Sequence, residues 1–284
     1  MWLIPLVLLV GLIIWWVLEN RAHQQNLAKI PIRIHINGTR GKSSTTRLII
    51  WGLMGGGMKV VGKTTGSAPR LIIQGKEEPI QRRGQVNIKE QIQVIRKATK
   101  HKPDALVIEC MAIEPELQYV SEHKFIRSHI GVITNIREDH LDLMGPTINR
   151  VAEALAGTIP ENGVLFTTDT AFTDELSSYS KSKGSEFVRV TPDNITEDEM
   201  SGFNYIEHRE NVALALAVCK HLGVDRAQAL KSMWKANPDV GALKIYQIEE
   251  FGKQIYFANM FAANDAYSTL EAMRTLRVQE KDYP

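Results

Sequence analysis

The first apolar segment of the chain is its longest and contains no charged side chain. It covers residues 2–18, and at about 1.5 Å per residue a helix of this length nearly crosses the hydrocarbon core of a bilayer. Trp2 stands at one end and the pair Trp15 and Trp16 at the other, where interfacial aromatic side chains belong. The pattern therefore predicts a transmembrane signal anchor over residues 1–19.

The charges that follow this segment predict its orientation. Arg21, Lys29 and Arg33 come after the span, whereas only the terminal amine precedes it. This bias of basic residues places the main body of the protein in the cytoplasm. A cleaved signal peptide would begin with basic residues and end with small ones, and neither feature is present. A buried core helix remains the alternative for the same apolar run.

Beyond a polar linker over residues 20–30, helical spacing alternates with continuous apolar runs typical of strands buried on both faces. This alternation predicts an α/β fold with a mostly parallel sheet covered by helices, here as one domain over residues 31–242. We expect strands at residues 32–36, 59–61, 105–109, 130–134 and 164–167, and helices at residues 43–54, 88–99, 148–156, 174–180, 209–221 and 226–235.

The end of the chain predicts a separate unit. Residues 243–248 and 254–258 have the pattern of strands, and residues 265–276 have the pattern of a helix. No further strand follows to complete another α/β unit. We therefore interpret residues 243–284 as the incomplete start of a C-terminal α/β domain.

The composition limits the classes of partner. Among 284 residues, 34 are basic and 32 acidic, and the net charge of +2 disfavours a dedicated nucleic-acid binder, which carries a basic stripe. Cys110 and Cys219 have neither CxxC nor zinc-type spacing, which suits a reducing compartment and burial of both side chains. We therefore expect no nucleic-acid partner.

Two segments compete as a phosphate-binding loop. Residues 57–64 match the pattern GxxxxGK[ST] letter for letter, but that motif requires a strand, a loop and then a helix. Residues 59–61 are themselves an apolar strand, and residues 65–69 do not continue readily as a helix because they include Gly66 and Pro69. The literal match is therefore interpreted as chance.

The preferred loop lies between a strand that ends at Ile36 and a helix that begins at Ser43. Gly38 and Gly41 allow tight turns that direct amide groups at an anion, and the helix N-terminus adds further N–H groups. Lys42 can neutralise charge on the β- and γ-phosphates of a nucleotide, and the Ser43 hydroxyl can reach Mg²⁺. A glycine turn capped by serine is the alternative. The expected nucleotide-binding residues of this loop are Gly38, Thr39, Arg40, Gly41, Lys42, Ser43 and Ser44.

The loop form G-T-x-G-K-[ST]-[ST] resembles the signature of the Mur ligase superfamily, which includes the folylpolyglutamate synthases. Glu109 stands at the carboxyl end of a buried strand, where that family keeps a magnesium-binding glutamate. Residues 134–142 are similar to the family motif T-N-[IV]-x-x-D-H-x-D, which implies that His140 is a second metal-site residue. Residues 208–215 are similar to a helix whose asparagine, here Asn211, contacts the adenine.

Each of these assignments has a structural alternative. Glu109 could be a strand-end acid paired with a surface lysine, and Asn211 could be an ordinary helix-start residue. Residues 138–142 could form an acidic turn that caps the next helix.

A narrower resemblance covers nearly the whole chain. A membrane span followed in order by N-G-x-R-G-K-S, V-G-K-T-T-G, E-C-M-A, E-D-H-x-D-x-M-G-P-T and F-A-A-N-D-A is similar to the ligase subunits of poly-γ-glutamate synthases from capsule-forming bacteria. Those proteins carry a longer C-terminal domain that begins near Phe261. We expect only its first strand and helix here, and hence a chain that is truncated at its C-terminus.

The resemblance implies an ATP-dependent, ADP-forming amide ligase. ATP and Mg²⁺ would activate a glutamate γ-carboxyl as an acyl-phosphate, which the α-amine of another glutamate attacks to extend a poly-γ-glutamate chain. The implied catalytic residues are Lys42, Glu109 and His140, and the implied metal-site residues are Ser43, Glu109 and His140. Implied partners are other membrane subunits of a synthase complex. The implied location is the bacterial cell membrane, with a single span and a cytoplasmic main domain.

Two other functions remain open at this point. The chain could be another Mur-like ligase that acts on a folate or on a cell-wall precursor, although the predicted anchor disfavours the soluble folate enzymes. It could also be a non-catalytic remnant or subunit that binds ATP and is completed by another polypeptide.

Overall fold

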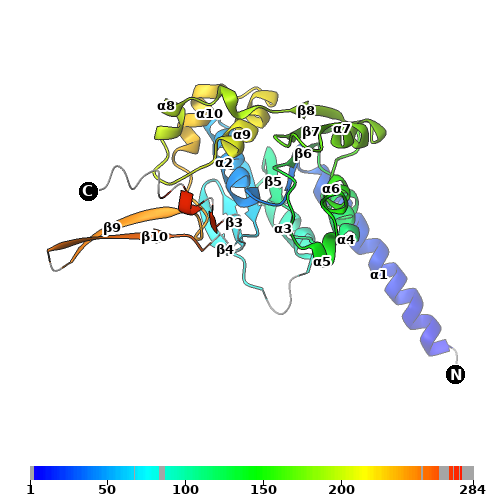
Figure 1. Cartoon of the computed structure of the whole chain (residues 1–284). Coiled ribbons are helices and arrows are strands. Elements are labelled where there is room, and N and C mark those ends of the chain that lie inside the picture. The colour runs from blue at the N-terminus through cyan, green and yellow to red at the C-terminus, as the bar shows by residue number, and fades with distance from the viewer. Residues whose placement is uncertain are drawn as a thin grey trace.

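The computed structural model describes residues 3–66, 68–82, 87–250, 252–261, 269–270, 272–274 and 276. Its helices and strands alternate along most of the chain (Figure 1). In chain order they are α1 (Leu3–Ala28), β1 (Ile32–Asn37), α2 (Lys42–Gly55), β2 (Val60–Thr64), β3 (Arg70–Ile73), β4 (Lys76–Pro79), α3 (Glu90–Thr99), β5 (Ala105–Glu109), α4 (Pro115–Val120), the π-helix η1 (Ser121–Ile126), β6 (Ile130–Ile133), α5 (Leu141–Met144), α6 (Ile148–Ala156), β7 (Val164–Thr167), α7 (Thr173–Ser182), β8 (Glu186–Arg189), the 3₁₀ turn η2 (Pro192–Asn194), α8 (Glu197–Ser201), α9 (Arg209–His221), α10 (Arg226–Met233), β9 (Lys244–Glu250) and β10 (Lys253–Asn259).

An eight-stranded sheet in the order β4-β3-β2-β5-β1-β6-β7-β8 forms the centre of the molecule. All neighbours among β2, β5, β1, β6, β7 and β8 pair in parallel, whereas β3 pairs antiparallel with β2, and β4 pairs antiparallel with β3 at the edge of the sheet. Strands β5, β6 and β7 are almost entirely apolar because both of their faces are covered by other elements. The edge strand β4 instead carries charged side chains, which oppose pairing with another sheet. The predicted α/β fold with a mostly parallel sheet is confirmed.

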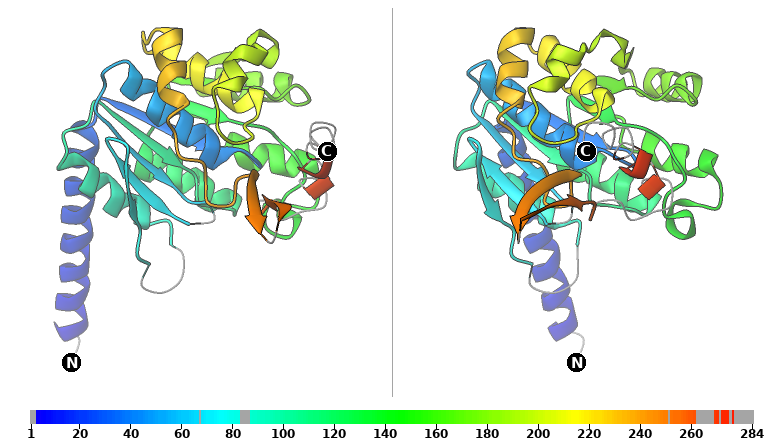
Figure 2. Two further views of the ribbon diagram at one scale, coloured as in Figure 1. Left: turned by 90° about the vertical axis from the view of Figure 1, so that its left-hand side faces the viewer. Right: turned by 60° about the vertical axis from the view of Figure 1, so that its left-hand side comes forward.

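Helices cover both faces of this sheet (Figure 2). Because successive strand residues point to opposite faces, Ile34 and Ile36 of β1 contribute to one core, together with residues of α2, α9 and α10. Leu106 and Ile108 of β5 face the other side, where residues of α3 pack on them. Over β6 and β7, this second face is covered by α6 and α7, which pack on Leu165. The result is a three-layer arrangement in which β1 lies at the centre of the middle layer.

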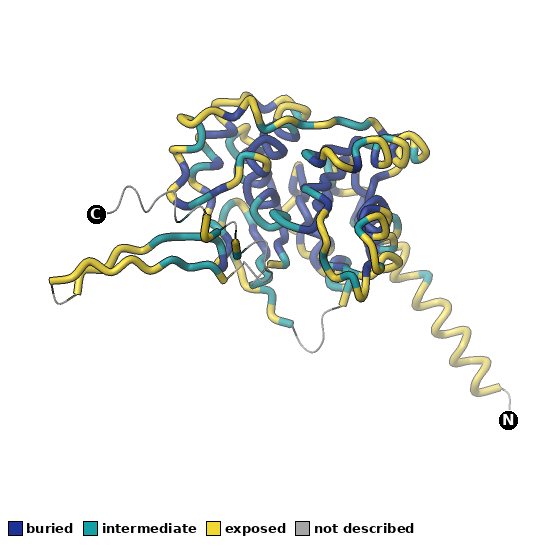
Figure 3. Tube along the Cα trace, viewed as in Figure 1, coloured by how far each residue is buried: buried dark blue, intermediate teal, exposed yellow. Residues whose placement is uncertain are grey.

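The N-terminal helix α1 projects from this body with its apolar side chains exposed (Figure 3). An 18-residue window of α1 has a mean hydropathy of 2.1 and no buried residue, so the helix is long and apolar enough to cross a membrane. The helix continues beyond the apolar segment to Ala28, because residues 19–28 contain neither glycine nor proline. Residues 20–28 of the predicted linker are therefore helical, and the role of residues 20–30 as a linker stays a prediction. Leu27 is buried against the body, and His23 Nε2 lies 2.8 Å from the Phe125 carbonyl oxygen.

The structure departs from the sequence predictions mainly at the margins of the sheet. β3, β4 and β8 have no counterpart among the predicted strands because charged residues interrupt their apolar pattern. β9 and β10 confirm the two predicted strands of the last unit, and they pair as an antiparallel hairpin. The predicted helix over residues 265–276 lies mostly outside the described residues.

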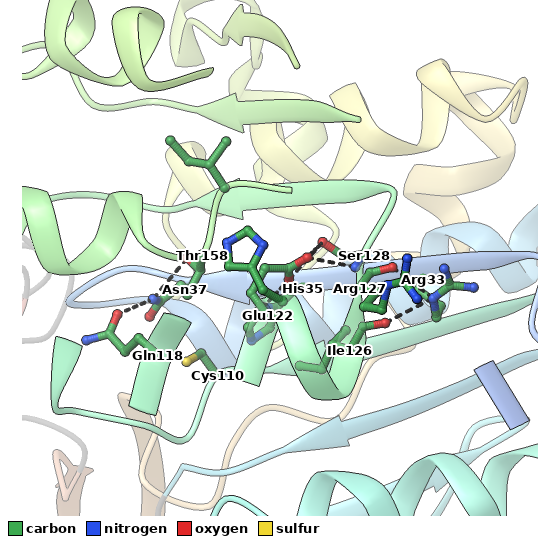
Figure 4. Close-up of polar contacts among 12 residues, drawn as sticks. Arg33, His35, Asn37, Cys110, Gln118, Glu122, Ile126, Arg127, Ser128 and Thr158 are labelled. Atoms are coloured by element: carbon green, nitrogen blue, oxygen red, sulfur yellow. Dashed lines mark hydrogen bonds and ion pairs between the residues drawn. The ribbon is translucent and has the colours of Figure 1, made fainter. Parts of the chain in front are cut away.

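The layer on one side of β1 is polar rather than apolar (Figure 4). His35 Nδ1 lies 2.8 Å from Glu122 Oε2, and both side chains are buried. Glu122 also accepts hydrogen bonds from the backbone amide and the hydroxyl of Ser128. Two residues further along β1, Asn37 donates a hydrogen bond to the side-chain oxygen of Gln118 at 2.7 Å. These contacts fix β1 against α4 and η1, so the loop that follows Asn37 starts from a rigid position.

We expect stability to decrease above neutral pH because of His35. Burial lowers the pKa of this histidine, but the adjacent Cys110 and Glu122 raise it more, to about 9. A group with a raised pKa stabilises the fold fully below its unfolded value of about 6.5 and loses that effect as the pH rises through about 9. The free energy of unfolding should therefore fall by up to about 3 kcal/mol between pH 6.5 and 9.5. Chemical unfolding at a series of pH values checks this slope, and the variant His35→Gln should lack it.

Candidate functional site

The loop at residues 38–41 joins β1 to α2 and requires glycine at two positions. Gly38 has φ +129° and Gly41 has φ +80°, both values that favour glycine. A Cβ at position 38 would overlap Thr134 Oγ1, and a Cβ at position 41 would lie 2.5 Å from Asn211 Oδ1. The loop therefore packs directly against two segments that follow much later in the chain.

The segment after β6 holds this loop in place. Asn135 Oδ1 accepts hydrogen bonds from Thr39 Oγ1 at 2.6 Å and from the Arg40 amide at 3.1 Å. In return, Asn135 Nδ2 donates to the Arg40 carbonyl at 3.1 Å, and Thr134 Oγ1 donates to the same oxygen at 2.6 Å. The Thr134-Asn135 pair thus satisfies the backbone groups of the loop. Sequence reasoning noticed these two residues as part of a motif, but it did not find this supporting role.

The loop ends at the N-terminus of α2, where Lys42 is the first helical residue. Lys42 Nζ lies across the loop and donates to the carbonyl oxygens of Gly38 at 2.7 Å and Thr39 at 3.2 Å. Ser44 follows in the first turn of α2 and is half-buried. Free backbone N–H groups and the positive end of the helix dipole favour an anion at such a terminus. The structure therefore brings the predicted loop residues together, while their contact with a nucleotide stays a prediction.

A carboxylate from the neighbouring strand lies beside the loop. Glu109 ends β5 and is only 2% exposed. Its Oε2 accepts a hydrogen bond from Ser43 Oγ at 2.8 Å and another from the Thr65 amide at 2.6 Å. Glu109 forms no ion pair with a lysine within the described residues, so the structure does not favour the alternative of a lysine-paired acid. Ser43 and Glu109 offer the oxygen ligands that hard divalent cations prefer.

The predicted metal residue His140 follows Asp139, which contacts Arg40 of the loop. It precedes α5 with φ +44°, and its ring is 45% exposed. Its Nε2 is 3.8 Å from Asp139 Oδ1, and Asp139 Oδ2 lies 3.2 Å from Arg40 Nη1. The His140 side chain makes no capping hydrogen bond to α5. In the described part of the chain, no three His, Cys, Asp or Glu side chains form a ready metal cluster, so the joint role of His140 and Glu109 stays a prediction.

Asn211 lies in the first turn of α9 and is buried against the loop. Its Oδ1 accepts a hydrogen bond from Thr45 Oγ1 at 3.2 Å, and its Nδ2 donates to Glu207 Oε1 at 2.8 Å. Burial raises the pKa of Glu207, and its hydrogen bond from Asn211 opposes that rise. Asn211 thus joins α2 to α9 beside Gly41, whereas its predicted contact with adenine stays a prediction. Glu207 carried no sequence signal, since it lies in a loop and belongs to no motif.

The literal motif match at residues 57–64 is not a phosphate loop. Its second half forms strand β2, and Lys63 is completely buried there. Lys63 Nζ lies 2.8 Å from Glu90 Oε1 and 3.1 Å from Gln91 Oε1. Burial lowers the pKa of Lys63, and the ion pair with Glu90 opposes that shift. The choice of residues 38–44 by structural context is therefore confirmed as far as the strand–loop–helix geometry is concerned.

We expect the variant Gly41→Ala to disturb the loop more than a comparable variant elsewhere. Alanine at φ +80° is strained by about 1–3 kcal/mol, and its Cβ would also displace Asn211. The matched control is Gly57→Ala, since Gly57 has φ +84° but no atom of the described residues lies within 4 Å of its Cβ position. Both variants should lower the melting temperature, but only Gly41→Ala should weaken binding of a fluorescent ATP analogue. Equal ATP affinity in the two variants would contradict the packing role of Gly41.

This geometry agrees with comparisons to known proteins. Residues 36–227 match the Mur ligase middle domain, and residues 245–284 match the poly-gamma-glutamate synthase CapB C-terminal domain. The chain therefore belongs to the Mur ligase family.

Two relatives narrow the similarity within this family. The PGA synthase CapB of Bacillus subtilis (strain 168) is 41% identical over 287 residues, which cover 100% of this chain and 72% of that protein. The capsule biosynthesis protein CapB of Bacillus anthracis is 41% identical over 276 residues, which cover 94% of this chain but only 60% of that protein. The chain thus spans 60–72% of the length of these curated relatives.

Solved structures share the fold at low sequence identity. The FolC protein of E. coli in complex with ADP aligns with a TM-score of 0.70 and 16% identity, over 93% of this chain and 69% of that chain. A bifunctional folylpolyglutamate synthase/dihydrofolate synthase with Mn, AMPPNP and L-glutamate bound aligns with a TM-score of 0.67 and 14% identity, over 91% and 69% of the two chains. These similarities establish the fold of the present chain.

Proposed function

We propose that this chain is an ATP-dependent, ADP-forming amide ligase that joins glutamates through the γ-carboxyl in poly-γ-glutamate synthesis. The observation that carries the proposal is the hydrogen bond from Ser43, in the loop at residues 38–44, to Glu109 at the carboxyl edge of the parallel sheet. Open α/β sheets bind their ligands at this edge. The substrate class is supported by the 41% identity to the PGA synthase CapB of Bacillus subtilis.

The loop supplies the groups that an ATP triphosphate needs. Gly38 and Gly41 keep the backbone close to the ligand, and α2 presents its free N–H groups to the phosphates. The Lys42 ammonium now hydrogen-bonds to loop carbonyls, and a charged phosphate oxygen is a stronger acceptor than a neutral carbonyl. We infer that Lys42 turns from the carbonyls to the β- and γ-phosphates when ATP binds.

Ser43 and Glu109 fit a divalent cation, and we infer that this cation is Mg²⁺. A hydroxyl and a carboxylate 2.8 Å apart are the kind of oxygen donors that Mg²⁺ accepts beside the phosphates of a nucleotide. The related synthase with bound Mn and AMPPNP supports a metal–nucleotide complex. Such an ion, when bound, supplies charge neutralisation at the phosphate oxygens. His140 is the proposed third residue of this metal site.

The proposed reaction has two steps. A γ-carboxylate oxygen attacks the γ-phosphorus of ATP, so that an acyl-phosphate forms and ADP leaves. The amine of the next glutamate then attacks the acyl carbon, releases phosphate and loses a proton as the amide forms. Lys42 contributes by holding the oxygens of the transferred phosphoryl group, where negative charge accumulates in the transition state.

We further propose that α1 anchors the protein in the bacterial cell membrane with the main domain in the cytoplasm. An 18-residue window of α1 has a mean hydropathy of 2.1 and no buried residue. Arg21 and Lys29 follow this window, as expected for a cytoplasmic flank. The growing polymer and other membrane subunits of a synthase are the proposed partners.

The proposal is tested with the detergent-purified chain, ATP, Mg²⁺, glutamate and a short poly-γ-glutamate acceptor. We expect ADP release that depends on glutamate and on the acceptor. Parallel reactions with a folate and with a cell-wall precursor distinguish the other Mur-like ligases. If the chain binds ATP but releases no ADP with any substrate, it is a non-catalytic ATP-binding subunit and the proposed activity is wrong.

A further inference from the structure

A second carboxylate approaches the Ser43 hydroxyl from the segment that joins α10 to β9. Asp239 lies in this connection and is only 8% exposed. Its Oδ1 accepts a hydrogen bond from the Gly241 amide at 3.2 Å, and its backbone carbonyl accepts one from the Ala242 amide at 2.9 Å. Its Oδ2 is buried and has no hydrogen-bond partner among the residues that the structure describes. The position of Asp239 is therefore fixed, while one oxygen of its carboxylate is unused.

Gly66 shows where this unused oxygen points. A Cβ at position 66 would lie 2.6 Å from Ser43 Oγ and closer still to Asp239 Oδ2. Both oxygens therefore lie next to the same point beside Gly66, and the side chain of any larger residue would collide with them. Since Ser43 Oγ also donates to Glu109 Oε2, buried carboxylates from two distant parts of the chain lie near the same hydroxyl.

This arrangement is costly unless a cation is present. A buried carboxylate oxygen without a partner loses its hydration, and a second carboxylate nearby adds repulsion. Within the described residues, Asp239 and Glu109 form no ion pair with a lysine or arginine. A divalent cation would remove both costs, because carboxylate and hydroxyl oxygens are its preferred ligands.

We propose that Asp239 binds, through Oδ2, the same divalent cation that Ser43 and Glu109 bind. This inference rests on the proposed function, which requires a metal–nucleotide complex at this loop. It adds a ligand that belongs to neither the phosphate loop nor the sheet. It also gives the connection to residues 243–284 a contact with the cation. Arg47 of α2 also contacts the connection between α10 and β9, since its Nη1 donates to the Asn237 carbonyl at 3.4 Å.

The test is the variant Asp239→Asn, with binding of Mn²⁺ measured by electron paramagnetic resonance in the presence of a non-hydrolysable ATP analogue. Asparagine keeps the oxygen that accepts from Gly241 but replaces the charged Oδ2. We expect Mn²⁺ affinity to fall by at least about 10-fold, with unchanged affinity for the metal-free nucleotide. The matched control is Asp174→Asn, which removes an exposed carboxylate from the first turn of α7 and should leave both affinities unchanged.

The outcomes separate this inference from the proposed function. If the unaltered chain binds Mn²⁺ with the nucleotide and Asp239→Asn binds it within twofold as tightly, Asp239 only shapes the turn and the inference is wrong. If the unaltered chain binds no metal–nucleotide complex, the proposed function fails, and this inference fails with it.

A second measurement uses the unaltered chain, so it does not depend on how well the variant folds. In protein labelled with ¹⁵N-glycine, Mn²⁺ and the ATP analogue should broaden the amide signal of Gly241, which donates to the Asp239 carboxylate. Gly223, in the turn after α9, serves as the control signal and should stay sharp. A Gly241 signal as sharp as that of Gly223 would overturn the assignment of Asp239 to the cation.

Discussion

Replacing Lys42 with methionine is expected to weaken ATP binding by about 100-fold and to abolish measurable ADP release. Methionine keeps much of the length and apolar character of the side chain but removes the ammonium. That ammonium is the first-turn charge of α2 and already spans the loop from Gly38 to Thr39. A hydrogen bond to a charged group contributes about 1.5–3 kcal/mol, and the contribution grows when charge develops on a transferred phosphoryl group. Isothermal titration with an ATP analogue and a coupled ADP assay give the two values.

The control for this experiment is Lys59→Met, which removes an exposed lysine from the literal motif match at residues 57–64. The lysine that the literal match would direct at a phosphate is Lys63, which is buried in strand β2, so Lys59 tests only the loss of a positive charge from that segment. Lys59→Met should therefore bind ATP like the unaltered chain. Unchanged ATP affinity in the Lys42 variant would exclude the loop at residues 38–44 as the phosphate site.

Replacing Glu109 with glutamine is expected to lower glutamate-dependent ADP release by at least about 100-fold and to raise the metal concentration required for half-maximal rate. Glutamine can still accept hydrogen bonds from Ser43 and from the Thr65 amide, so the local structure should be retained. What it lacks is the negative charge that a divalent cation requires. Rates measured over a range of Mg²⁺ concentrations separate this loss from a change in ATP affinity.

The control for this variant is Glu116→Gln, which neutralises an exposed carboxylate in the first turn of α4. It should leave both the rate and the metal dependence unchanged. An equal loss in both variants would mean that net charge, and not a metal contact, explains the effect. A Glu109→Gln protein with a lowered melting temperature and an unchanged metal dependence would assign Glu109 a purely structural role.

The sequence was sufficient for the features that depend on neighbouring residues. Continuous apolar runs predicted β5 and β7 with their observed bounds, because strands covered on both faces need apolar residues at every position. The same local reasoning separated the two phosphate-loop candidates, since residues 59–61 have a strand pattern and a helical pattern begins at Ser43. The long apolar N-terminal segment likewise predicted a helix that projects from the body.

The sequence patterns did not predict contacts that depend on the order of the strands in the sheet. Asn135 holds Thr39 across 96 residues because β6 is the sheet neighbour of β1, and periodicity alone does not specify such neighbours. The polar pair His35 and Glu122, 87 residues apart, is hidden for the same reason. A polar residue in an apolar strand shows no partner in the sequence, and only the fold supplies one.

The sequence by itself thus determined the loop, the class of fold and the projecting apolar helix, because each follows from residues that are close along the chain. The tertiary structure alone decided which distant side chains meet the loop. Ser43 lies beside Glu109 because β1 and β5 are neighbours, and Asp239 lies near it because the connection after α10 passes Gly66. Asp239 belonged to no motif and attracted no prediction. Its unpaired oxygen beside the Ser43 hydroxyl becomes apparent only when the sheet order and helix packing bring these segments together.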